Sequence, residues 1–136
     1  GKICLTTGLG YAHGKTLKSL IENTNLNITW HQAPPNLADL MYQSKVIITA
    51  PGSMLFEAAS MGKSIIMIKT AENQNGNIEL FELSEAAILS TVSNIYSCIQ
   101  IIEDKSKILA LKAKAISDGK GKYRIAHCIH QNSSLI

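Results

Sequence analysis

The chain has 136 residues, of which 46% are hydrophobic and 17% are charged, and its formal net charge is +3. This length corresponds to one domain with a sizeable core, and the composition excludes a disordered chain. The basic residues of segment 105–122 alternate with apolar ones and have no aromatic residues between them, which indicates a solvated helix face and no nucleic-acid partner. No apolar run approaches the ~20 residues that a membrane span requires.

Short apolar runs bounded by turn residues predict five strands, over residues 3–7, 27–31, 45–49, 64–69 and 86–89. The segments around them predict helices over residues 15–23, 37–43, 54–61, 78–85, 92–101, 104–117 and 123–131. Strands that alternate with helices are typical of an α/β fold with a doubly wound parallel sheet. We expect one domain over residues 1–136, with strand 46–49 at the centre of the sheet and strands 3–7 and 65–68 beside it.

The stretch 45–69 predicts a strand, a tight loop, a helix and a second strand. Strand 45–49 is apolar without alternation, so we expect both of its faces to be buried. Pro51 and Gly52 end it, Ser53 is the predicted N-cap of the helix, and Gly62 is its predicted C′ residue. A helix N-terminus that follows a parallel strand offers unpaired N–H groups and a positive dipole end to an anion. Open α/β sheets bind their ligands at this edge.

A second glycine-rich loop, GLGYAHG, follows the first predicted strand at residues 8–14. It resembles a loop that cradles phosphate, although its spacing is not GxGxxG. Gly14, Lys15 and Thr16 match the end of a Walker loop, but Leu9 stands where that motif requires a glycine. The sequence therefore excludes a P-loop ATPase.

The three cysteines, Cys4, Cys98 and Cys128, are widely spaced and odd in number, which supports neither a disulfide framework nor a zinc site. We expect buried thiols in a reducing compartment, and hence a cytoplasmic protein. His127 and His130 lie three residues apart on the last predicted helix, but the sequence shows no third ligand beside them. We therefore predict no metal site.

Four sequence blocks occur in a fixed order between residues 33 and 125: APPNLADLM, VIITAPGSMLFEAASMGKSIIMI, AENQNGN and DGKGKYRI. This order resembles the C-terminal, nucleotide-binding half of two-domain sugar-nucleotide enzymes with the GT-B fold. Within that group the chain is most similar to the UDP-sugar hydrolase of pseudaminic acid biosynthesis and the related spore-coat polysaccharide proteins. It is more distantly similar to the UDP-N-acetylglucosamine transferases of glycosyltransferase family 28. The final block, DGKGKYRI, favours the hydrolase branch.

The resemblance implies a Rossmann-like domain that binds a UDP-sugar without a cofactor. It implies that Gly52 and Ser53 receive the diphosphate and that Glu57, one helical turn further on, accepts hydrogen bonds from the ribose hydroxyls. Gln74 and Asn77 would face the sugar. These residue types suit that chemistry, because helix N–H groups bind phosphate, a carboxylate binds a diol, and amides bind hydroxyl and acetamido groups.

Gly8 and Gly10 would form the other side of the cleft, facing an N-terminal domain that the resemblance implies. The family loop is usually GG[ST][ST], and this chain departs from it at two positions. Pro51 removes an N–H donor and Met54 removes a hydroxyl. One strand–helix unit common in the family is also absent before residue 27.

Two functions remain open. The first is half of a UDP-sugar hydrolase or glycosyltransferase for cell-surface polysaccharide or nonulosonic acid biosynthesis. Such a half would be inactive alone, because no catalytic residue is identified and an N-terminal GT-B domain must join it, in the same chain or as a separate subunit. The second is a non-catalytic binding or interaction module that kept the fold; a split transferase with a membrane partner is a third possibility. The chain starts with Gly-Lys and enters a strand at once, so we expect a piece of a longer protein.

Overall fold

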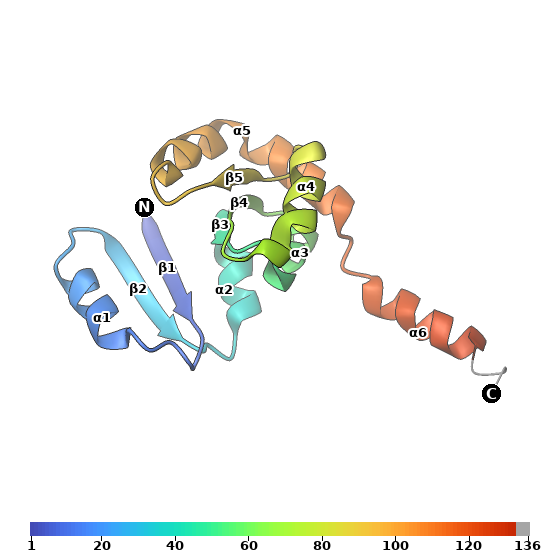
Figure 1. The fold of residues 1–136 in the computed structure, drawn as a ribbon, viewed down its shortest axis with the longest axis horizontal. Coiled ribbons are helices and arrows are strands. Elements are labelled where there is room, and N and C mark those ends of the chain that lie inside the picture. Colours follow the sequence, from blue (N-terminus) through green and yellow to red (C-terminus); the bar gives the residue numbers. More distant parts are fainter. Residues whose placement is uncertain (133–136) are drawn as a thin grey trace. The chain divides into compact units, whose positions relative to one another are not determined.

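The structure is a computed structural model that describes residues 1–132. The chain divides into two compact units, Gly1–Gln43 and Ser44–Ile136. Figure 1 shows the elements of both in chain order, from blue to red. None of the helices within residues 1–132 has the length and apolarity that crossing a bilayer requires.

The first unit contains a parallel β–α–β arrangement followed by a short helix. Its elements are β1 (Lys2–Thr7), α1 (Gly14–Glu22), β2 (Asn27–Gln32) and α2 (Leu37–Gln43). β1 and β2 pair in parallel over six positions, and the Trp30 Nε1–H donates to Thr7 Oγ1 at 3.0 Å between them. The Trp30 ring lies so close to Gly14 that a Cβ atom there would be 3.2 Å from Trp30 Cη2. The glycine therefore allows α1 to start against the indole.

The second unit is built on a three-stranded parallel sheet in the order β3-β4-β5. Its elements are β3 (Val46–Thr49), α3 (Ser53–Ser60), β4 (Ser64–Ile68), the 3-10 turn η1 (Glu72–Gln74), α4 (Asn75–Leu83), β5 (Ile88–Ser90), α5 (Ile95–Ile116) and α6 (Gly121–Asn132). Parallel strands alternate with helices here as well, which confirms the predicted α/β class.

The predicted parallel pairing of strand 46–49 with strand 65–68 is confirmed by β3 and β4. Within the three-stranded sheet of the second unit, β4 lies between β3 and β5, so β4 and not strand 46–49 is the central strand there, contrary to the prediction. The physical reason is burial: all residues of β4 except Ile68 are buried, whereas Ile48 in β3 is 48% exposed. The expectation that both faces of β3 are buried was therefore wrong too. The strand with the most continuous apolar sequence takes the interior position.

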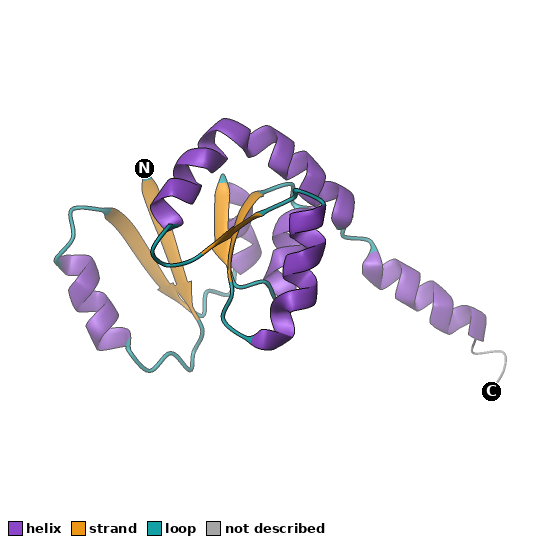
Figure 2. Cartoon of the chain, turned by 45° about the horizontal axis from the view of Figure 1, so that its top comes forward, coloured by secondary structure: helices purple, strands orange, loops and turns teal. Residues whose placement is uncertain are grey.

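The long helix α5 covers β4 and β5 and forms part of the core. Cys98, Ile102 and Leu109 of α5 pack with Ile66 of β4 in one buried cluster. Two helices were predicted, over residues 92–101 and 104–117, but α5 is continuous, and Figure 2 shows it as one helix. The polar residues 103 and 104 lie on the solvent side of the helix and do not end it. No glycine or proline interrupts the helix, and its buried stripe continues to Ala113.

Helices α3 and α4 contribute further buried residues to the second unit. α3 buries Leu55, Ala58 and Ala59, and α3 contacts both β3 and β4. Phe56 of α3 and Phe81 of α4 meet edge to face with 5.5 Å between ring centroids, and Phe81 is fully buried. Such aromatic pairs add stability beyond the area they bury.

Three local predictions require correction and one is confirmed. Gly62 ends α3 with φ at +65°, as predicted for a C′ glycine. Ser53 is not the N-cap: it is the first helical residue, and Gly52 is the cap, with no side-chain cap bond. α4 begins at Asn75 and not at residue 78, so the polar loop is shorter than predicted. Of the three thiols expected to be buried, Cys4 and Cys128 are exposed.

Candidate functional site

The loop between β3 and α3 has a defined backbone geometry. The Gly52 N–H donates to the Ala50 carbonyl at 2.8 Å, and the Leu55 N–H donates to the Gly52 carbonyl at 3.1 Å, which closes the first turn of α3. Apart from Gly52 and its two chain neighbours, no described residue has an atom within 4 Å of the position that a Gly52 Cβ would take, so the space beside the loop is open. A helix does not use the N–H groups of its first turn, and here Ser53 and Met54 carry them.

Asn77 connects the start of α4 to this loop. Its Nδ2–H donates to the Pro51 carbonyl at 2.8 Å, across 26 residues of sequence. Pro51 is fully buried and Asn77 is half-buried. This link was not predicted, and no sequence signal pointed to it, because the two residues belong to separate sequence blocks.

Gln74 closes the turn that leads into α4. Its Oε1 accepts hydrogen bonds from the N–H groups of Thr70 at 2.9 Å and Ala71 at 3.2 Å, and its Nε2–H donates to Thr70 Oγ1 at 3.1 Å. These contacts explain why the helical turns start earlier than predicted. Lys69 pairs with Glu72 at 2.8 Å beside them, and the hydrogen bond from Lys69 lowers the pKa of Glu72.

Glu57 is exposed on α3, four residues after Ser53, so the two side chains lie on the same face about one turn apart. Within residues 1–132 the Glu57 carboxylate makes no hydrogen bond or ion pair, whereas its main-chain carbonyl accepts one from Ser60 Oγ at 2.8 Å. The carboxylate therefore keeps both oxygens available as acceptors.

Gly8 and Gly10 belong to the loop between β1 and α1 in the first unit. The Tyr11 N–H donates to the Gly8 carbonyl at 3.3 Å, and beyond the adjacent residues no described residue has an atom within 4 Å of a Cβ position at either glycine. The seven predicted site residues thus form two groups. Gly8 and Gly10 lie in the first unit, and the other five lie in the second, close to the start of α3 and α4.

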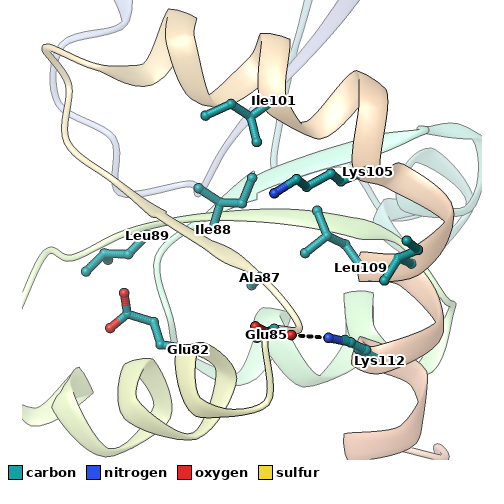
Figure 3. Close-up of a pocket in the computed structure, with 10 residues that line it drawn as sticks. Glu82, Glu85, Ala87, Ile88, Leu89, Ile101, Lys105, Leu109 and Lys112 are labelled. Carbon is teal, nitrogen blue, oxygen red and sulfur yellow. Dashed lines mark hydrogen bonds and ion pairs between the residues drawn. The ribbon is translucent and has the colours of Figure 1, made fainter.

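A hollow of about 600 Å³ lies elsewhere in the second unit, between β5, α5 and the end of α4. Figure 3 shows apolar side chains such as Ile88 and Leu109 around it, with Lys112 paired to Glu85. The hydrogen bond from Lys112 lowers the pKa of Glu85. None of the seven predicted site residues lines the hollow, and the sequence analysis did not anticipate it. No group of three or more metal-ligating side chains occurs in the part of the chain that the structure describes.

The parallel sheet, the glycine loop at the start of α3 and the flanking helices define the fold as the Rossmann-like half of a GT-B protein. A solved structure with this fold is MurG of Acinetobacter baumannii. The two align with a TM-score of 0.73 and 16% identity, over 96% of this chain and 42% of MurG. The glycotransferase of kitacinnamycin aligns with a TM-score of 0.58 and 13% identity, over 84% of this chain and 37% of that one.

The chain therefore spans less than half the length of either protein. Likeness at this level of identity establishes the fold and not the activity. No protein-family model and no curated protein sequence matches the chain.

Proposed function

We propose that this chain is the UDP-sugar-binding half of a GT-B enzyme, either a nucleotide-sugar hydrolase or a glycosyltransferase. The observation that carries the proposal is the open glycine loop at the start of α3, which Asn77 joins to the start of α4. This link brings the N-terminus of α3, where N–H groups can bind an anion, next to the polar start of α4.

The proposed binding mode assigns one part of the ligand to each group. Gly52 lets the diphosphate approach the backbone, and the N–H groups at Ser53 and beyond donate to it. Glu57 accepts two hydrogen bonds from the ribose hydroxyls, for which its carboxylate is available. Gln74 and Asn77 face the sugar with those amide atoms that the loop contacts leave unused.

The proposal requires a second, N-terminal GT-B domain, in the same chain or as a separate subunit, and it assigns Gly8 and Gly10 to the surface that faces that domain. Residues 1–136 then act as one nucleotide-sugar-binding domain, and we assign no catalytic residue within it. The resemblance of DGKGKYRI to the hydrolase branch favours hydrolysis, in pseudaminic acid or cell-surface polysaccharide biosynthesis. Free thiols at Cys4, Cys98 and Cys128 fit a reducing cytoplasmic location.

A non-catalytic interaction module is the second candidate. Pro51 and Met54 favour it, because they replace an N–H donor and a hydroxyl in the loop that would bind the diphosphate. Pro51 is also fully buried, so it serves the packing of the loop as well.

A thermal-shift titration with UDP, UDP-N-acetylglucosamine and ADP tests the proposal. A ligand that binds only the folded state stabilises it by about 2.7 kcal/mol when its concentration is 100 times the Kd. We expect UDP and the UDP-sugar to raise the melting temperature and ADP to raise it less. If no nucleotide raises it, the interaction module becomes the better explanation.

A further inference from the structure

We infer that Asn77 is a positioning residue for the β3–α3 loop: by holding the Pro51 carbonyl it fixes the direction in which the Ser53 and Met54 N–H groups point. The inference rests on the proposed function, since it concerns how this loop is prepared for a diphosphate. It adds a role to Asn77 that differs from contact with the sugar.

One carbonyl of the loop depends on a side chain for its hydrogen bond. The Pro51 carbonyl accepts from Asn77 Nδ2 at 2.8 Å, and among residues 1–132 no main-chain N–H bonds to it. Pro51 is fully buried, and a buried carbonyl without a partner is unfavourable. The side chain of Asn77 thus satisfies a group that the secondary structure leaves unpaired.

The peptide unit between Pro51 and Gly52 links the contact with Asn77 to the direction of the loop. The Pro51 carbonyl and the Gly52 N–H belong to the same planar group, so holding one orients the other. The Gly52 N–H donates to the Ala50 carbonyl at 2.8 Å. Asn77 and Ala50 therefore hold this peptide unit from its two sides, and the next free donors along the chain are those of Ser53 and Met54.

Gly52 has unusual freedom of backbone conformation. A residue without a Cβ atom has access to more backbone conformations than any other, and nothing fills the space beside it. That openness allows a phosphate to approach, but it also leaves the start of α3 free to change direction. The hydrogen bond from Asn77 to the Pro51 carbonyl holds the peptide unit before Gly52, and the one from the Leu55 N–H to the Gly52 carbonyl holds the unit after it. Together they restrict Gly52 before a ligand arrives, which lowers the cost of ordering the loop on binding.

The experiment compares Asn77→Leu and Asn77→Asp with the unmodified chain. Both variants remove the N–H donor at similar side-chain size, but only the second adds a negative charge. Asn73→Asp is the matched control, because Asn73 is exposed, lies in the neighbouring turn and has no side-chain hydrogen bond within the described residues. Amide hydrogen exchange without ligand is measured at Gly52 and Leu55, whose N–H groups are hydrogen-bonded within the loop, with the amides of β4 as the reference for correct folding.

We expect both Asn77 variants to speed exchange at Gly52 and Leu55 about tenfold while β4 stays protected, and the control to change neither. In calorimetry and NMR titrations both Asn77 variants should weaken UDP binding about tenfold. Their affinity for uridine, which has no phosphate, should stay within about twofold of that of the unmodified chain. If the role of Asn77 were purely structural, its substitution would weaken the binding of UDP and of uridine alike.

Unchanged exchange at Gly52 and Leu55 in both variants overturns the inference. A loss of UDP affinity in Asn77→Asp alone also overturns it, because charge repulsion then explains the loss. Failure of the unmodified chain to bind UDP contradicts the proposed function, and the exchange measurement still decides whether Asn77 positions the loop.

Discussion

Glu57 is the single residue on which the proposed ribose contact depends. A carboxylate that accepts two ribose hydroxyls makes two charge-assisted hydrogen bonds, each worth about 1.5–3 kcal/mol. Glu57→Gln keeps the shape and removes the charge, so it should weaken UDP binding about tenfold or more, since about 1.4 kcal/mol is a factor of ten. The melting temperature should hardly change, because Glu57 is exposed.

Calorimetric titration of both proteins with UDP gives the comparison. Glu79→Gln is the matched control, because Glu79 is an exposed glutamate on α4 outside the proposed site. Equal UDP affinities for the unmodified chain and Glu57→Gln would remove Glu57 from the site.

Asp118 and Arg124 form a local ion pair with a measurable pH response. Arg124 donates to both carboxylate oxygens, at 2.8 Å and 3.1 Å, and this contact lowers the pKa of Asp118 from 3.8 to about 2. Because the folded-state value is depressed, any stability from the pair is present above pH ~4 and is lost as the pH falls towards 2. Carboxyl NMR titration should give a midpoint near 2 for Asp118, rising in Arg124→Gln; an unchanged midpoint would show that Arg124 is not the cause.

At the scale of the element, α5 offers a matched test of burial. Ile102 is fully buried in the core cluster with Ile66, whereas Ile108, six residues further along the same helix, is 61% exposed. Ile102→Ala should reduce the free energy of unfolding by about 2–5 kcal/mol, through lost burial and the cavity left behind. Ile108→Ala should reduce the free energy of unfolding by much less, about 0.5 kcal/mol. Urea unfolding measures both, and similar losses would mean that Ile102 does not belong to the core.

The elements also show which sequence signals were reliable. Short apolar runs bounded by turn residues identified all five strands found within residues 1–132. The break expected between residues 101 and 104 does not exist, since two polar residues on the solvent side of a helix do not interrupt its hydrogen bonds. The start of α4 was missed because Gln74 accepts hydrogen bonds from two earlier N–H groups, a contact that no residue pattern reveals.

For the whole molecule, the proposed function predicts that the chain alone releases no UDP from a UDP-sugar at an appreciable rate. The chain corresponds to 42% of MurG, and no nucleophile and base pair stands out in its sequence. A coupled assay for UDP release measures this directly. Steady release by the purified 136-residue chain that Glu57→Gln abolishes would contradict the prediction.

By itself the sequence determined the α/β class, the approximate helices and strands, and the glycine loop before α3, because apolar runs, periodicity and turn residues are local signals. The tertiary structure alone decided that β4 lies between β3 and β5, since strand order depends on competition for the buried position. It alone also decided that Asn77 bonds to Pro51, because a hydrogen bond across 26 residues depends on how α4 and the loop meet in space.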